Sequence, residues 1–242
     1  MTDSHYDLLV YGATPGGLAC AVRAAREGLR VLLVHHHAHL GGFLTSGAGG
    51  WEAPYDGFRC PLLAELRQGA TTYYREHYGE GSQQHLASLP KADSRRHIDR
   101  PKLEPRVAEL LIERLLAGEP SLTVWRGWYP VGADRREALL HAVTFQAMAA
   151  QERRAVHADT FADGSYEGDL LAITGTPYRV GREARSEYHE PHAGRLFVTE
   201  RPHEPGLAGW PRVAAAGTLA MRSFGHSSAA PIARASDGAG DQ

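Results

Sequence analysis

The first 34 residues combine two buried strands, a glycine turn and a helix. Apolar runs at residues 6–11 and 30–34 lack polar alternation, which is typical of parallel strands that are covered on both faces. Between them, apolar residues recur at helical spacing over 18–25, and the pattern stops before Gly28. A strand–helix–strand unit of this length is right-handed. The sequence therefore predicts an α/β fold built on a parallel sheet with helices on both faces.

The turn between the first strand and the helix has the spacing of a dinucleotide-binding loop. In the G-x-G-x-x-G pattern, Gly12 supplies the tight turn and Gly17 lets the helix pack closely on the strand, while Thr14 replaces the middle glycine. The free N–H groups of such a turn and the positive end of the helix form an anion site, which fits a pyrophosphate. This favours a Rossmann-like dinucleotide-binding domain over a plain Gly-Pro turn.

The residue that ends the second strand departs from the usual dinucleotide pattern. An acidic residue about 20 positions after the first glycine normally binds the ribose hydroxyls, but His35 stands at this place. A neutral imidazole offers one acceptor where a carboxylate offers two oxygens, so we expect a weaker or differently made ribose contact. Loss of the acid also permits a 2′-phosphate beside His35 or His36. An NAD(P)-binding oxidoreductase is therefore a second hypothesis.

The middle of the chain predicts more helices and a small β-meander. Amphipathic patterns indicate helices at 61–78 and 103–116, within a helical excursion over about 52–116 whose stretch 79–100 is polar and aperiodic. Three apolar segments joined by charged turns predict the strands of a β-meander at about 122–161. The segments lie at 122–128, 139–146 and 155–161.

The helix and strand periodicity of the apolar residues is lost toward the C-terminus. Prolines interrupt the sequence after about residue 200, and residues 236–242 form a polar tail. We therefore expect one domain over residues 1–195 and an irregular C-terminal segment over 196–242, which could be disordered.

Five segments in the same order resemble a known family. They read YDLLVYGATPGG with VLLV at 6–34, HLGGFLTSG at 39–47, LEPRVAE at 103–109, FADGSYEGDL at 161–170 and YRVGREARSEY at 178–188. Together they resemble the N-terminal portion of FAD-dependent oxidoreductases of the glutathione-reductase type. The likeness is greatest to a bacterial group that is also similar to the flavin part of heterodisulfide reductase (HdrA).

The resemblance implies a flavoprotein that transfers hydride or electrons through FAD. It implies that the glycine turn cradles the pyrophosphate, that the doublet after the second strand lies beside it, and that the strand near residues 129–131 passes the adenine. The segment ending at Asp169 would return the chain to the cofactor. The predicted cofactor-binding residues are Gly12, Ala13, Thr14, Pro15, Gly16, Gly17, His35, Gly41, Gly42, Thr45, Val131, Gly168 and Asp169. No catalytic residue is predicted.

Three departures from the family bear on function. His35 stands where the family has Glu, and Gly164 stands where it has Ala. Relatives of this type continue well beyond this length, so we expect an N-terminal portion that is incomplete relative to the family. The missing C-terminal half, or a second copy in a homo-oligomer, is the expected partner besides an unknown small-molecule substrate. A non-catalytic remnant of a flavoprotein is a third hypothesis.

The charge balance and the apolar pattern exclude other partners. There are 26 Lys and Arg against 28 Asp and Glu, a net charge of −2, which argues against nucleic acid or an anionic membrane surface. No run approaches the ~18 apolar residues of a membrane span, and no secretory signal precedes the first strand. These features predict a cytoplasmic location.

Metal sites are not expected. The histidines at 35–39 lie on an extended segment, where neighbouring side chains face opposite sides, and no carboxylate or cysteine lies close in the sequence. The two cysteines, Cys20 and Cys60, cannot supply the four thiolates of an iron–sulfur cluster. Cys20 lies between two alanines on the first helix and is expected to be a small buried core residue.

Overall fold

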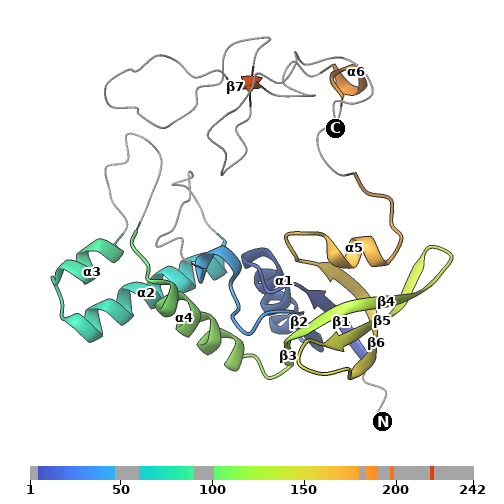
Figure 1. Cartoon of the computed structure of the whole chain (residues 1–242). Helices are drawn as coiled ribbons and strands as arrows, with labels where there is room; N and C mark the ends of the chain where they lie inside the picture. The colour runs from blue at the N-terminus through green and yellow to red at the C-terminus, as the bar shows by residue number, and fades with distance from the viewer. Residues whose placement is uncertain are drawn as a thin grey trace. The chain divides into compact units, whose positions relative to one another are not determined.

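The chain divides into two compact units, Met1–Pro177 and Tyr178–Gln242. The structure is a computed structural model that describes residues 5–46, 60–89, 101–179, 184–189, 197–198 and 219–220 (Figure 1). In the second unit, α6 (Arg185–Tyr188) precedes β7 (Phe197–Val198), which pairs antiparallel with β8 (Leu219–Ala220). The predicted boundary after residue 195 stays a prediction, because most of that region lies outside the described residues.

A six-stranded sheet forms the centre of the first unit. Its strands are β1 (His5–Tyr11), β2 (Val31–His35), β3 (Leu122–Arg126), β4 (Trp128–Arg136), β5 (Leu139–Ala147) and β6 (Arg153–Asp163), in the order β3-β2-β1-β6-β5-β4. The first four in this order are parallel, and β5 and β4 continue the sheet antiparallel. The parallel strands therefore all end at one edge, which is where open α/β sheets bind ligands. The predicted α/β fold is confirmed.

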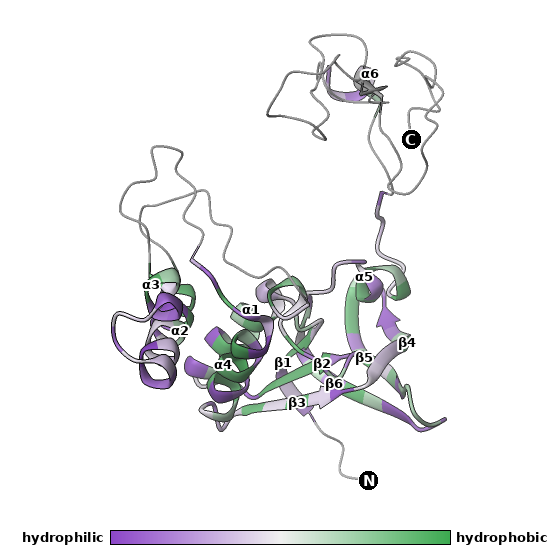
Figure 2. Cartoon of the chain, turned by 60° about the vertical axis from the view of Figure 1, so that its left-hand side comes forward, coloured by the Kyte–Doolittle hydropathy of each residue, from purple (hydrophilic) through white to green (hydrophobic). Residues whose placement is uncertain are grey.

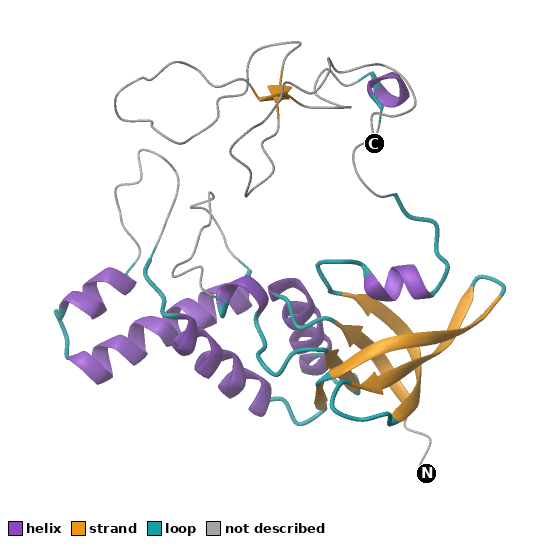
Figure 3. Cartoon of the chain, viewed as in Figure 1, coloured by secondary structure: helices purple, strands orange, loops and turns teal. Residues whose placement is uncertain are grey.

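One face of the sheet is covered by helices (Figure 3). α1 (Pro15–Arg26) and α4 (Pro105–Ala117) pack their apolar stripes on β1 and β2. α2 (Pro61–Tyr78) joins α4 through a separate apolar cluster, and α3 (Gln83–Ser88) follows α2. Figure 2 shows apolar residues gathered where these helices meet the sheet. Among the described residues, no helix is both long and apolar enough to traverse a bilayer.

The helices agree with the predicted ones except in the polar stretch. The helix predicted over 61–78 has those bounds, and the one predicted over 103–116 is α4. The sequence pattern predicts no periodic structure for 79–100, but this stretch contains α3. The Ser82 hydroxyl caps this helix by accepting from the His85 N–H, and the buried His85 ring fixes the turn by accepting from the Gly81 N–H.

The prediction that Cys20 is buried is wrong, because this thiol is exposed. The buried stripe of α1 runs through Gly17, Leu18, Ala21, Val22 and Ala25. On a helix with 3.6 residues per turn, position 20 points away from this stripe even though its sequence neighbours are small.

Arg26 connects the far end of α1 to two other parts of the helical layer. Its Nε donates to the Glu119 carboxylate at 2.6 Å, and its terminal nitrogens donate to Glu65 of α2 at 2.9 and 3.1 Å. One guanidinium therefore joins α1, α2 and the turn that leads from α4 to β3.

The other face is covered by the β4–β5 hairpin and by α5 (Asp169–Ile173). Leu9, Leu32, Val143 and Phe145 are fully buried in the cluster between them. The expected meander over 122–161 differs in one strand. β3 pairs in parallel with β2, and the meander consists of β4, β5 and β6. Only Gly127 separates β3 from β4. Its positive φ of 72° turns the chain away from the parallel pairing with β2 and into the antiparallel pairing with β5.

Three glycine backbones meet where β1 ends. Gly12 has a φ of 99°, which side chains rarely adopt. A Cβ on Gly17 would overlap the Gly12 carbonyl, and a Cβ on Gly164 would lie 2.7 Å from the Gly17 Cα. The Gly164 N–H donates to the Tyr11 carbonyl at 2.7 Å. The start of α1 and the turn after β6 therefore approach one another at backbone distance, with no room for a methyl group.

A methyl group at position 17 is expected to push the start of α1 away from the end of β1. We predict that Gly17→Ala lowers the free energy of unfolding by roughly 2–4 kcal/mol, because backbone atoms must move to admit it. Gly16→Ala is the matched control. Its Cβ would enter open space, 3.9 Å from the Thr14 hydroxyl, so stability should change by no more than about 1 kcal/mol. Urea denaturation measures both variants, and equal stability would contradict the close approach.

Candidate functional site

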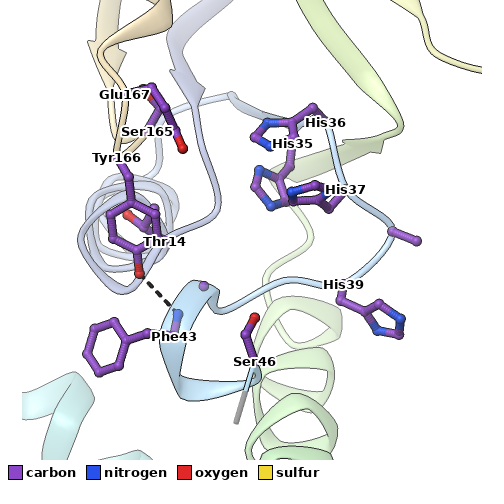
Figure 4. A pocket seen from close by; sticks show the side chains of 12 residues that line it. Thr14, His35, His36, His37, His39, Phe43, Ser46, Ser165, Tyr166 and Glu167 are labelled. Atoms are coloured by element: carbon purple, nitrogen blue, oxygen red, sulfur yellow. Dashed lines mark hydrogen bonds between the residues drawn. The ribbon is translucent and has the colours of Figure 1, made fainter. Parts of the chain in front are cut away.

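The candidate site is a cavity of about 530 Å³ at the edge where the parallel strands end (Figure 4). Small-molecule pockets typically measure ~300–1,000 Å³. Three segments supply the lining: the glycine turn, the segment after β2 and the turn after β6. The lining residues are Thr14, His35, His36, His37, Ala38, His39, Gly42, Phe43, Ser46, Ser165, Tyr166 and Glu167.

The start of α1 presents a bare helix end beside this cavity. Thr14 is the N-cap, and its hydroxyl accepts from the Gly17 N–H at 3.3 Å and donates to the Gly164 carbonyl at 2.6 Å. Pro15 is the first helical residue, where a missing N–H is tolerated. Gly16 is exposed and carries no side chain. This surface fits a phosphate group, because the helix end is positive and no described residue covers Gly16.

His35 is buried behind the glycine turn. Its Nδ1 accepts a hydrogen bond from the Ala13 N–H at 3.3 Å. Burial, together with the neighbouring rings of His36 and His37, lowers the pKa of His35 to about 4. The ring is therefore neutral at pH 7. This agrees with the contact, because a protonated imidazole has no lone pair with which to accept the Ala13 N–H.

The loop after β2 is attached to the same turn. The Gly41 N–H donates to the Ala13 carbonyl at 2.8 Å, and the Thr45 hydroxyl donates to the Leu40 and Gly42 carbonyls. The φ of Gly41 is 104°, and a Cβ there would collide with Thr45 and Ile112. These contacts hold the loop against the cavity.

Tyr166 closes one side of the cavity. Its hydroxyl accepts from the Phe43 N–H at 3.1 Å, as Figure 4 shows. A Cβ on Gly42 would overlap this hydroxyl, so Gly42 allows the ring to approach. The turn that carries Tyr166 is shaped by Asp163, whose carboxylate accepts from the Ser165 N–H at 2.9 Å and from the Leu171 N–H at 2.9 Å.

A second hollow of about 540 Å³ adjoins the first, and His36 and Glu167 line both. The other lining residues are Tyr11, Tyr129, Met148 and Asp169. The buried Tyr11 hydroxyl donates to Asp169 Oδ2 at 3.3 Å and lies 3.1 Å from His36 Nδ1. Burial and the nearby Asp169 carboxylate raise the pKa of Tyr11, so the phenol stays protonated. The hollow thus combines an aromatic wall with a fixed polar group.

The structure brings most of the predicted cofactor residues to these two cavities. Thr14, His35 and Gly42 line the first cavity, and Asp169 lines the second. Gly12, Ala13, Pro15, Gly16, Gly17, Gly41 and Thr45 form the turns beside the first cavity. Gly168 is the N-cap of α5 with a φ of 74°, and Val131 lies in β4; neither lines either cavity.

Sequence reasoning misses several lining residues. Ser165, Tyr166 and Glu167 lie within the segment FADGSYEGDL, so the resemblance contains the signal for them. The sequence suggests His36 and His37 only as metal ligands or beside a 2′-phosphate. Tyr11 ends an apolar strand, and only the fold, which places Asp169 of α5 and His36 beside it, reveals its polar contacts.

The structure describes no candidate metal site. Within the described residues, no group of three or more His, Cys, Asp or Glu side chains is arranged to hold an ion. The rings of His35, His36 and His37 lie against one another with centroids 4.0–5.5 Å apart. Cys20 and Cys60 are both free and exposed.

The burial of neutral His35 predicts a pH-dependent stability. Its folded pKa of about 4 lies below the ordinary value of 6.5, so its stabilising effect is complete above about pH 6.5 and is lost as the pH falls toward 4. As the pH falls from 7 to 5, the titration of this residue should lower the free energy of unfolding by about 2 kcal/mol. His35→Gln keeps an acceptor for Ala13 but does not titrate, so its urea-unfolding free energy should fall less over this range. Parallel losses in both proteins would refute this assignment.

The Thr14 hydroxyl predicts a second stability difference. Thr14→Val removes both the acceptor for the Gly17 N–H and the donor to the Gly164 carbonyl, so unfolding should become easier by about 1–2 kcal/mol. Thr14→Ser retains both contacts and should stay within about 0.5 kcal/mol of the wild type. Thermal denaturation compares the two, and a valine variant as stable as the serine variant would be incompatible with this role.

Comparison with known proteins relates this chain to a family of flavoenzymes. The profile of a family described as FAD dependent oxidoreductase matches residues 7–233. The alpha subunit of sarcosine oxidase from Corynebacterium sp. (strain P-1) is 53% identical over 45 residues, which are 19% of this chain and 5% of that protein.

Solved structures with a similar fold have low sequence identity. Thermovibrio ammonificans THI4 matches with a TM-score of 0.49 and 11% identity over 74% of this chain and 64% of its own. The p-nitrophenol 4-monooxygenase PnpA from Pseudomonas putida DLL-E4 matches with a TM-score of 0.49 and 14% identity over 75% of this chain and 46% of its own. The chain thus spans less than two thirds of each of these relatives. Because the family profile matches nearly the whole chain, the protein belongs to the FAD-dependent oxidoreductase family, and its cofactor is FAD.

Proposed function

We propose that the chain binds the ADP half of FAD in the two adjoining cavities and serves as the cofactor-binding part of an oxidoreductase. The observation that carries this proposal is the bare surface at Gly16. It lies at the positive end of α1, beside a cavity that the glycine turn, the segment after β2 and the turn after β6 enclose. When bound, FAD supplies hydride or electron transfer at its isoalloxazine ring.

The pyrophosphate is assigned to the start of α1. In the first turn of α1, Pro15 has no N–H and the Gly17 N–H donates to the Thr14 hydroxyl, which leaves the Gly16 N–H to meet an anion. The helix dipole favours an anion there. Thr14 acts as a cap and not as a phosphate donor, since its single hydroxyl proton goes to the Gly164 carbonyl. The Gly16 N–H is therefore the donor that we propose for the phosphates.

The adenine is assigned to the second hollow. Its lining includes the flat Tyr129 ring and the adaptable Met148 side chain, which suit a planar base. The resemblance implies that the strand near residues 129–131 passes the adenine, and of these residues Val131 lies outside the lining. We therefore propose Tyr129, two residues earlier on β4, as the contact from this strand.

Finer features of the function remain proposals. The five motifs support kinship with glutathione-reductase-type flavoproteins and with the flavin part of heterodisulfide reductase. The match to the sarcosine oxidase chain covers 45 residues, about the length of a strand–helix–strand unit with its loops, so we propose no substrate from it. A cytoplasmic location and a partner that completes the flavin-ring pocket also remain proposals.

The bare helix end predicts a selective effect on cofactor affinity. Gly16→Ala should weaken FAD binding by about tenfold or more, because its methyl group occupies the space that a phosphate would approach, while the fold is retained. Quenching of flavin fluorescence measures the dissociation constant. Cys20→Ala lies on the same helix with its thiol exposed and should bind FAD like the wild type.

Three other outcomes would redirect the assignment. Equal FAD affinity of Gly16→Ala and the wild type would move the pyrophosphate away from α1. Tighter binding of NADP(H) than of FAD would favour the nicotinamide hypothesis. Absence of any nucleotide binding, together with apolar dye binding, would favour a non-catalytic remnant.

A further inference from the structure

A side-chain hydrogen bond spans the first cavity at the end away from the second hollow. His36 and Glu167 line both cavities, and Figure 4 shows them at one end of the first cavity. Phe43 lies at the other end, next to Tyr166. There the Phe43 N–H donates to the Tyr166 hydroxyl at 3.1 Å. One hydrogen bond therefore connects the loop after β2 to the turn after β6 at this end.

The backbones on both sides of this hydrogen bond are held by other contacts. In the turn after β6, the Asp163 carboxylate accepts from the Ser165 N–H at 2.9 Å and from the Ser165 hydroxyl at 2.6 Å. In the loop after β2, the Thr45 hydroxyl donates to the Gly42 carbonyl at 3.1 Å. Leu44 of the same loop packs on the apolar cluster between α2 and α4. The tyrosine side chain is therefore the part that moves most easily when this end opens.

Little apolar burial holds the Tyr166 ring in its position. The residue is 60% exposed, and its neighbour Phe43 is 53% exposed. Exposed side chains change rotamer rapidly unless a specific contact fixes them. Among the hydrogen bonds of the described residues, the one to the Phe43 N–H is the contact that holds this hydroxyl. A single neutral hydrogen bond thus keeps the ring across the end of the cavity.

The linear shape of FAD makes this end of the cavity relevant. In FAD, the adenine and its ribose lead to two phosphates, and beyond them to the ribityl chain and the isoalloxazine ring. Thr14, the N-cap of α1, lies between the two ends of the cavity in Figure 4. With the adenine in the second hollow and the phosphates at the start of α1, the flavin half extends toward Phe43 and Tyr166. ADP ends at its second phosphate and does not extend past them.

We infer that the hydrogen bond between Tyr166 and Phe43 is a latch, which excludes the flavin half of FAD until it breaks. The inference rests on the proposed function, because that assignment fixes the order of adenine and phosphates along the cavities. Binding of FAD requires the latch to open, whereas binding of ADP does not. The net strength of a neutral hydrogen bond corresponds to about two- to tenfold in a binding constant. The latch therefore lowers the affinity for FAD by this factor and leaves the affinity for ADP unchanged.

Titration with FAD and with ADP tests the latch. Tyr166→Phe keeps the ring but removes the acceptor of the Phe43 N–H, so this variant should bind FAD about two- to tenfold more tightly than the wild type does. Its affinity for ADP should stay within about twofold of the wild type. Isothermal titration calorimetry measures both ligands. The matched control is Tyr78→Phe on α2, which changes another exposed tyrosine and should bind both ligands like the wild type.

The outcomes separate the latch from the proposed function. Weaker binding of FAD by Tyr166→Phe would make the hydroxyl a contact of the cofactor, which overturns the latch and leaves the proposed function intact. Unchanged affinity for FAD would also overturn the latch. Equal gains for FAD and ADP would place the obstruction on the ADP half and overturn it too. A wild type that binds neither ligand would refute the proposed function, and the latch with it.

A measurement on the wild type covers the case in which the variant fails to fold. The NMR resonance of the Phe43 amide reports its hydrogen bond to Tyr166. We expect FAD to shift this resonance and ADP to leave it in place. A Phe43 amide that responds equally to both nucleotides, or to neither of them when both bind, would overturn the inference.

Discussion

The contact of three glycine backbones is the constraint on which the rest of the site depends. Gly12, Gly17 and Gly164 bring the end of β1, the start of α1 and the turn after β6 to backbone distance. The Thr14 hydroxyl then reaches the Gly164 carbonyl and caps the helix in the same place. If these segments were separated by the width of a methyl group, the helix end would no longer face the cavity. Gly164 is thus needed for this close packing, because a side chain at this position would collide with the Gly17 backbone.

Backbone hydrogen bonds extend this arrangement to the segment after β2. Ala13 donates its N–H to His35 and accepts the Gly41 N–H through its carbonyl. One residue of the glycine turn therefore positions both the histidine segment and the loop that follows it. The polar groups of the site are therefore oriented by contacts with the main chain.

The local patterns of the sequence predict more of this fold than of its site. The apolar runs of β1 and β2 and the stripe of α1 determine their structures directly, because burial selects such residues. The position of β3 was not predictable, since its pairing depends on a single turn at Gly127. The glycine turn predicts a dinucleotide site, but Tyr11 lies 158 residues from Asp169 and 25 residues from His36 in the sequence. Such contacts follow from register and packing, which no local pattern contains.

The guanidinium of Arg26 has a consequence for the helices that lie between β2 and β3 in the sequence. It joins α1 to Glu65 and Glu119 on the exposed side of the layer, and its side chain is about one third exposed. Ion pairs in such positions are screened by dissolved salt, whereas the apolar contacts beneath them are not. Concentrated salt should therefore loosen the attachment of α2 before it affects the sheet, so that this part of the chain responds to ionic strength independently of the two cavities.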